Sequence, residues 1–249
     1  MTFEILVVVG ALSGVTTVLF GFGGGFVTVP VIVWADAELG AEAMRTAVAT
    51  SAVVVFAASA IATASTRREI LASLRGKRAL LALLATGGVV GGLAARFAPA
   101  ELGQWAFVAY LGVTLMDTVA RPGFVRPVGV ATQKRTVRAG FGFPVGAVAA
   151  FLGVGGSVLT VPLLRRAGHS MESATALANP MTLAITAPAV VPLIASVDVT
   201  SAAALLLGAT PVVIVLRRYG IKIPDIVHAR AYVGLIGTVC VAMTLAALY

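Results

Sequence analysis

Residues 21–30 read GFGGGFVTVP, so four of the first five residues are glycine, within a long apolar run. Glycine in a helix interior costs about 1 kcal/mol relative to alanine. A cluster of glycines therefore weakens a helix at the point where it stands. The stretch predicts a break within an apolar helix, and the organisation of the whole chain follows from this break.

The sequence around this stretch is typical of an integral membrane protein. Its 249 residues are 59% hydrophobic and only 11% charged, whereas soluble domains carry about 25% charged residues. Apolar windows long enough for membrane helices recur along the chain, and they lack the alternation of barrel strands. They cover residues 3–34, 46–64, 79–95, 104–120, 139–164, 173–197, 199–216 and 231–249. We therefore expect an all-α polytopic membrane protein with about eight membrane segments.

The glycine-rich stretch occurs twice. Residues 10–30 (GALSGVTTVLFGFGGGFVTVP) and 142–162 (GFPVGAVAAFLGVGGSVLTVP) match at an offset of 132. Further on, TAVATS (46–51) aligns with TALANP (175–180) after a three-residue deletion in the loop. Internal similarity of this kind predicts a repeat. We divide the chain into a first transmembrane repeat (1–120), a basic cytoplasmic linker (121–138) and a second transmembrane repeat (139–249).

The charges predict how the two repeats are oriented. Sixteen of the eighteen Lys and Arg residues fall in segments 67–78, 121–138, 165–172 and 217–230, which we place in the cytoplasm. Residues 35–45 and 196–200, the loop around Glu101 and the N-terminus are placed outside. Segments 3–34 and 139–164 then begin and end on the same side. Each is predicted to be a re-entrant hairpin that turns at its glycines, which gives two inverted repeats.

The glycines have two interpretations. A broken helix exposes the N–H groups of its second half, and these groups favour anions. We assign this role to Gly23, Gly24, Gly155 and Gly156 because they recur beside Pro30 and Pro162. Close packing of neighbouring helices is the preferred interpretation for another set. That set is Gly10, Gly14, Gly87, Gly88, Gly91 and Gly92.

These motifs resemble the sulfite exporter TauE/SafE family, also called the TSUP family of membrane permeases. GFGGGFVTVP with TAVATS, and GVGGSVLTVP with TALANP, carry the resemblance over nearly the whole chain. It implies a secondary transporter that exports or takes up sulfite, sulfonates or related sulfur compounds across a bacterial inner membrane. The second half departs from the first where Asn179-Pro180 replaces Thr50-Ser51 and where Ser157 replaces Gly25. The two halves of the site are thus chemically unequal, and the substrate stays open.

The polar residues of the apolar windows are nearly all hydroxyls and amides, and Asp117 is the exceptional acid. A cation site would require several carboxylates, whereas neutral donors and helix N-termini suit a compact oxyanion. We therefore expect a small sulfur oxyanion or organosulfonate to bind between the two breaks, with no cofactor and no metal. The candidate substrate-binding residues are Gly23, Gly24, Gly25, Thr28, Thr50, Ser51, Gly155, Gly156, Ser157, Thr160 and Asn179. Most other Ser and Thr side chains are expected to bond a carbonyl one turn back.

Other functions are weighed against transport by a permease of sulfur anions. An anion channel, or a permease for a different small anion, remains an alternative. An intramembrane enzyme is disfavoured because only Asp117 is buried in a window, and because His169 and His228 lie in basic loops where solvation is expected. The net charge of +8 is assigned to the cytoplasmic loops and not to nucleic-acid binding. The coupling ion, the direction of transport and the oligomeric state, a homodimer included, stay open.

Overall fold

The computed structural model describes residues 2–35, 41–125, 138–220 and 223–248, and this part of the chain is helical with no strand. Six of its helices are long and apolar enough to cross a membrane. They are α1 (Phe3–Phe20), α3 (Ala41–Ala64), α5 (Arg78–Phe97), α9 (Met171–Leu193), α10 (Val199–Tyr219) and α11 (Asp225–Leu248). The predicted all-α polytopic fold is confirmed.

The remaining helices are shorter or carry more polar residues. They are α2 (Gly25–Ala35), α4 (Arg68–Ala72), α6 (Ala100–Ala120), α7 (Gly142–Phe151) and α8 (Ser157–Arg166), with single turns at Ala139–Phe141 and Ile194–Ser196. Each of the eight predicted windows coincides with one helix or with two helices in succession. Short α4 lies in a segment that we expected to be a loop.

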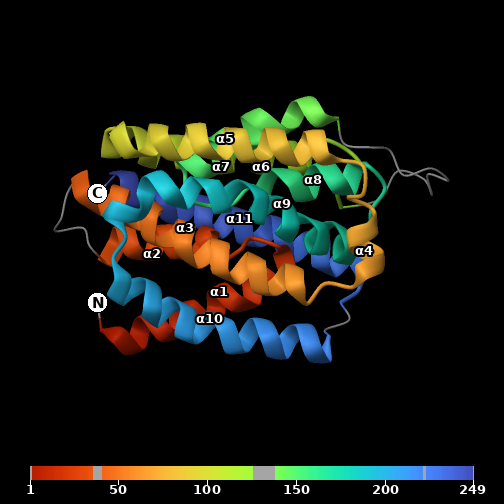
Figure 1. The fold of residues 1–249 in the computed structure, drawn as a ribbon, viewed down its shortest axis with the longest axis horizontal. Helices are drawn as coiled ribbons and strands as arrows, with labels where there is room; N and C mark the ends of the chain where they lie inside the picture. The colour runs from red at the N-terminus through yellow and green to blue at the C-terminus, as the bar shows by residue number, and fades with distance from the viewer. Residues whose placement is uncertain (1, 36–40, 126–137, 221–222, 249) are drawn as a thin grey trace.

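Both glycine-rich stretches break a helix, as predicted. The first break separates α1 from α2, and the second separates α7 from α8. Three glycines in each break have positive φ angles between 58° and 93°, a conformation that side chains with a Cβ atom rarely adopt. They are Gly21, Gly23 and Gly24 in the first break and Gly153, Gly155 and Gly156 in the second. In Figure 1, α2 turns back toward the end of the bundle where α1 begins.

The glycines that we assigned to packing lie in close helix contacts. A Cβ atom on Gly10 or Gly14 would come within 3.0 Å of a carbonyl oxygen of α10, and one on Gly87 or Gly91 would do so at α7. Gly88 and Gly92 approach carbonyls of α9 in the same way. In Figure 1, α1 and α10 form one edge of the bundle, and α5 and α7 form the opposite edge. The first hairpin thus packs against α10, a helix of the second half, and the second hairpin packs against α5, a helix of the first half.

The two termini lie at one end of the bundle (Figure 1). At the other end, which we call the charged end, arginines at the ends of α6 and α8 form ion pairs. Arg165, at the end of α8, has a side chain only 2% exposed and forms an ion pair with Asp225 at the start of α11. Its guanidinium also donates to the carbonyl oxygens of Phe124 (3.0 Å) and His169 (3.1 Å). These bonds fasten the end of α8 to α11 and to the segment that follows α6.

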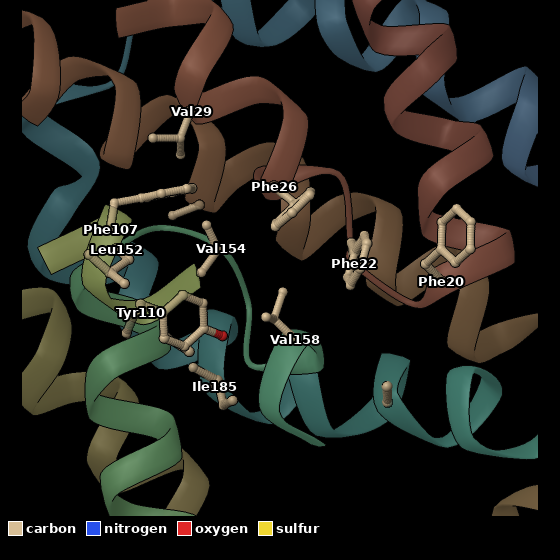
Figure 2. Packing of buried hydrophobic residues seen from close by; sticks show 14 of the residues in the cluster. Phe20, Phe22, Phe26, Val29, Phe107, Tyr110, Leu152, Val154, Val158 and Ile185 are labelled. Carbon is tan, nitrogen blue, oxygen red and sulfur yellow. The ribbon is translucent and has the colours of Figure 1, made fainter. Parts of the chain in front are cut away.

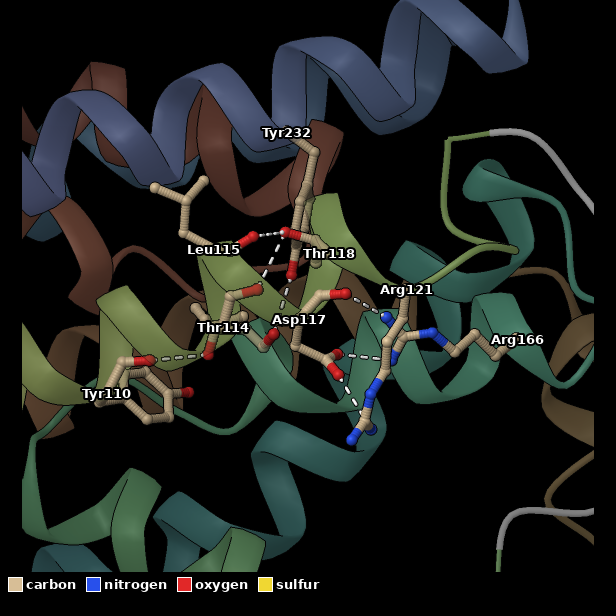
Figure 3. A network of polar contacts seen from close by, with 9 residues as sticks. Tyr110, Thr114, Leu115, Asp117, Thr118, Arg121, Arg166 and Tyr232 are labelled. Carbon is tan, nitrogen blue, oxygen red and sulfur yellow. Dashed lines mark hydrogen bonds and ion pairs between the residues drawn. The ribbon is translucent and has the colours of Figure 1, made fainter.

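A second arginine fastens the same end of α8 to α6. Arg166 donates to Asp117 Oδ2 at 2.5 Å and to the Asp117 carbonyl oxygen at 2.7 Å, and Arg121 pairs with Asp117 Oδ1 at 3.1 Å (Figure 3). The carboxylate of Asp117, the exceptional acid of the apolar windows, thus has two arginine partners.

The expectation for the two histidines is wrong, since both are buried. His228 Nε2 lies within hydrogen-bonding distance of the Leu19 carbonyl oxygen, and the His228 ring packs against Phe20. The reason is that α11 begins at Asp225, six residues before its apolar window, so a residue assigned to a loop becomes part of a packed helix.

The predicted orientation can be tested by the chemical accessibility of single cysteines. Residues 36–40 and 126–137, which include Asp36, Glu38 and most of the basic linker, lie outside the described residues. Exposed Arg75 and Glu101 replace them as test positions. In a Cys240→Ser background, we expect Arg75→Cys and Glu101→Cys to react with an impermeant thiol reagent from opposite sides of the membrane. Labelling of both from one side would show that α5 does not cross the membrane and would contradict the predicted orientation of the first repeat.

Candidate functional site

The two helix breaks meet in the interior of the bundle. A Cβ atom on Gly25 would lie within 3.0 Å of the Gly153 carbonyl oxygen, so the two backbones touch. Ser51, on α3, bridges them through its hydroxyl, which donates to the Gly153 carbonyl oxygen (2.8 Å) and accepts from Thr28 Oγ1 (2.9 Å). One α3 side chain thus holds the first hairpin against the second break.

One residue of α3 and one of α9 contact both breaks. Cβ atoms on Gly23 and Gly155 would lie 2.6 Å and 2.7 Å from Val55 Cγ1, and 3.4 Å and 2.6 Å from Thr182 Cγ2. Thr182 Oγ1 also donates to the Gly155 carbonyl oxygen at 3.4 Å. Helices α3 and α9 therefore form two walls around the meeting point of the breaks.

Each break also packs on a helix of the other half. Gly21 lies against Thr175 and Ala178 of α9, whereas Gly153 lies against Val48 of α3. The first break thus packs against α9, which follows the second break, and the second break packs against α3, which follows the first.

Gly24 and Gly156, the last glycines of the two breaks with positive φ, are also closely packed. A Cβ atom on Gly24 would overlap Ser13 Oγ of α1, and one on Gly156 would overlap Ile185 Cδ1 of α9 and touch α7 at Val145. Because φ is also positive at both glycines, neither position accepts a side chain without a shift of the surrounding chain.

Several buried polar atoms around the breaks have no hydrogen-bond partner among the described residues. Three belong to residues that we predicted, namely Ser157 Oγ, Thr160 Oγ1 and Asn179 Oδ1. Three others belong to residues outside the predicted set, namely Ser13 Oγ, Ser59 Oγ and the Tyr110 hydroxyl. Buried polar groups in folded proteins are nearly always paired, so unpaired groups concentrated in one region indicate a place for a ligand or water.

A substitution between the repeats explains why Thr160 is unpaired. Thr28, its counterpart in the first half, donates to Ser51 Oγ. The position matched to Ser51 in the second half is Pro180, whose side chain has no polar atom. Thr160 is therefore buried without the partner that Thr28 has.

In the structure, Asn179 lies in this region, whereas the side chain of Thr50 points away from it. Asn179 is buried on the same face of α9 as Thr175 and Thr182, and its amide donates to the Thr175 carbonyl oxygen at 3.1 Å. A second amide hydrogen remains. Thr50 Oγ1 instead accepts from the backbone N–H of Asp198, just before α10, at 3.0 Å. We therefore leave Thr50 out of the proposed site.

The side chains that touch the breaks are neutral. Serine and threonine hydroxyls and an amide supply the polar groups. Of the other buried polar residues, Arg165 pairs with Asp225 and bonds the Phe124 carbonyl oxygen, and His228 contacts the Leu19 carbonyl oxygen near the end of α1. Among the described residues, no group of three or more His, Cys, Asp or Glu side chains is placed to hold a metal ion. This region can offer N–H and O–H donors to an anion.

Apolar side chains fill the remaining space around the breaks. Figure 2 shows Phe22 and Phe26 of the first hairpin, which stack with ring centroids 4.6 Å apart, and Leu152 and Val154 of the second break. All four are fully buried. The breaks are in direct contact in this conformation, so a ligand could lie between them only after the hairpins separate.

A small cleft lies beside the second break, away from the charged end. Met44, Arg45, Val48 and Phe151 are among its lining residues, and its volume of about 20 Å³ suffices for one water molecule. Val48 is also the residue that packs on Gly153. A single layer of side chains thus separates this cleft from the second break.

Comparison with known proteins finds a family match that includes both helix breaks and the helices α3 and α9 beside them. The sequence pattern described as sulfite exporter TauE/SafE matches residues 6–246, nearly the whole chain. No curated protein and no solved structure matches the chain. On the strength of the family match, the chain belongs to the sulfite exporter TauE/SafE family of multi-pass membrane transporters.

Proposed function

We propose that the protein is a secondary transporter that moves a small sulfur-containing anion, such as sulfite or a sulfonate, across the bacterial inner membrane. The proposed binding region comprises the two helix breaks, with Gly23, Gly24, Gly25, Thr28 and Ser51 from the first half. Gly155, Gly156, Ser157, Thr160 and Asn179 complete it from the second half. The matched contacts of the two hairpins support the division into repeats at 1–120 and 139–249, which we keep as part of the proposal.

The observation that carries this proposal is the chemistry of the buried polar groups. The breaks are surrounded by hydroxyls and helix N-termini without carboxylates, and several of the hydroxyls are unpaired. Half-helix N-termini at mid-depth are a common way for transporters to bind anions. A metal ion or another cation would meet few acceptors here besides backbone carbonyls.

The contact between Gly25 and Gly153 suggests how transport would proceed. In the proposed cycle, the hairpins separate to admit the anion from one side, close as they are described here, and separate again toward the other side. The bonds of Ser51 to Thr28 and to Gly153 would break and re-form in each cycle. Direct backbone contact between the breaks favours this cycle over an anion channel, which requires a continuous open path.

Ligand-dependent stability tests the proposal on purified protein. We expect sulfite, thiosulfate or a small sulfonate to raise the unfolding temperature, because a ligand at 100 times its Kd stabilises the folded state by about 2.7 kcal/mol. Chloride at equal ionic strength and sodium, potassium or magnesium salts of one inert anion serve as controls. Stabilisation by a cation, with none by any sulfur anion, would contradict the proposal.

Flux measurements in proteoliposomes separate a transporter from a channel. We expect uptake of the stabilising anion to saturate with concentration and to be accelerated by unlabelled anion trapped inside. Flux that rises linearly and shows no such exchange would favour the channel.

A further inference from the structure

We infer that the hydroxyls of Tyr110, Ser157 and Thr160 form, with the first turn of α8, a subsite for the oxygen-bearing head group of a singly charged anion. This inference rests on the proposed function and deepens it, because it adds Tyr110 to the site and restricts the charge of the substrate.

Tyr110 brings a polar group to a place that its surroundings do not explain. It lies on α6, is 7% exposed, and its hydroxyl has no partner among the described residues. Figure 2 shows this hydroxyl pointing toward Val158, in the first turn of α8, amid Leu152, Val154 and Ile185. Burial of an unbonded hydroxyl costs about 1–3 kcal/mol in proteins, so phenylalanine would pack there at lower cost.

A second tyrosine at the same turn shows the contrast. Tyr232 of α11 (labelled in Figure 3) is also buried, but its hydroxyl donates to the Val158 carbonyl oxygen at 3.1 Å and lies 3.4 Å from the Ser157 carbonyl oxygen. Tyr232 thus has a complete structural role at the start of α8. The hydroxyl of Tyr110 does not, and it remains available to a ligand.

Ser157 and Thr160 place two more hydroxyls at the same helix start. Both are at most 1% exposed and both hydroxyls are unpaired. The N–H groups of a first helical turn have no intrahelical acceptor and carry partial positive charge. Three hydroxyls and these N–H groups supply several donors, which matches the three oxygens of a sulfite or sulfonate head.

The absence of a charged partner restricts the anion. The arginines of α8, Arg165 and Arg166, lie in its last turn, where they pair with Asp225 and Asp117. The residues labelled around the Tyr110 ring in Figure 2 are apolar. Neutral donors can replace the hydration of one negative charge, but burying a second charge without a counter-charge is far more costly. The subsite therefore favours hydrogen sulfite or an organosulfonate over a dianion such as sulfate.

Binding of methanesulfonate and sulfate to Tyr110→Phe and Tyr232→Phe tests this inference. We expect Tyr110→Phe to weaken methanesulfonate binding by about 10- to 100-fold, as for the loss of one hydrogen bond to a charged group. Its unfolding temperature without ligand should stay equal or rise, since an unpaired hydroxyl is removed. Tyr232→Phe should show the reverse pattern, with a lower unfolding temperature and a smaller change in affinity.

The possible outcomes are distinct. Equal methanesulfonate affinity in the parent protein and in Tyr110→Phe would overturn the subsite while leaving the proposed function in place. Sulfate binding as tight as methanesulfonate binding would overturn the restriction to single charge. If the parent protein binds no sulfur anion at all, both the proposed function and this inference fall.

Discussion

Gly25→Ala is expected to reduce transport by at least about tenfold while the protein still inserts into the membrane. A Cβ atom at this position would lie within 3.0 Å of the Gly153 carbonyl oxygen, Val55 and Ser51 at once. Overpacking of this kind costs about 1–3 kcal/mol. Because the proposed cycle passes through the closed conformation, a cost of 1.4 kcal/mol in that conformation alone slows the cycle about tenfold.

Gly112→Ala is the matched control for this variant. Gly112 lies within α6, and a Cβ atom there would meet no heavy atom within 4 Å. The exchange should keep transport unchanged and stabilise the helix slightly, by up to about 1 kcal/mol. The measurements are uptake into proteoliposomes and the amount of folded protein by gel filtration. Normal uptake by Gly25→Ala would show that contact between the breaks is not part of the cycle.

Arg165→Met is expected to lower the free energy of unfolding by about 1–3 kcal/mol, because buried hydrogen bonds are lost while the remaining Asp225 carboxylate, 38% exposed, can be solvated. The carboxylate of Asp225 would lose its partner, and the carbonyl oxygens of Phe124 and His169 would lose a donor. Arg218→Met, on the exposed last turn of α10, should change stability by less than about 0.5 kcal/mol. Thermal and denaturant unfolding in detergent measures both.

A double variant separates the charge effect from the loss of packing. Arg165→Met with Asp225→Leu removes both charges, so it should be less destabilised than Arg165→Met alone. Full recovery is not expected, because Asp225 Oδ1 also accepts from the N–H of Met171 at 2.9 Å. Greater destabilisation of the double variant would mean that the ion pair is not what fastens α8.

Local backbone chemistry made the fold predictable from sequence. Glycine is the residue that tolerates positive φ and close helix approach, so both breaks and the packing role of Gly10 and Gly91 followed from glycine spacing. The positions of charged residues were a poorer guide to where helices begin and end. α11 continues past its apolar window to Asp225, which is why His228 was misplaced in a solvated loop.

The candidate site was less predictable, because side-chain direction depends on tertiary contacts. Thr50 and Ser51 are neighbours in one motif, yet they point about 100° apart around α3. Ser51 reaches Gly153, whereas Thr50 binds Asp198, 148 residues away in sequence. Tyr110 was missed for another reason: a tyrosine in an apolar window is usually part of the core, and only the structure reveals that its hydroxyl is unpaired.

The cross-packing of the breaks has a consequence for synthesis of the protein. The first break lies against Thr182 of α9, and Gly23 precedes that residue by 159 positions. At about 5–20 residues per second, a ribosome takes roughly 10–30 s to cover this interval. During that time the newly inserted first hairpin has broken backbone in the bilayer, where unpaired N–H and C=O groups are costly. The nascent hairpin must therefore be sheltered by the insertion machinery, or by its own transient bonds, until the second half arrives.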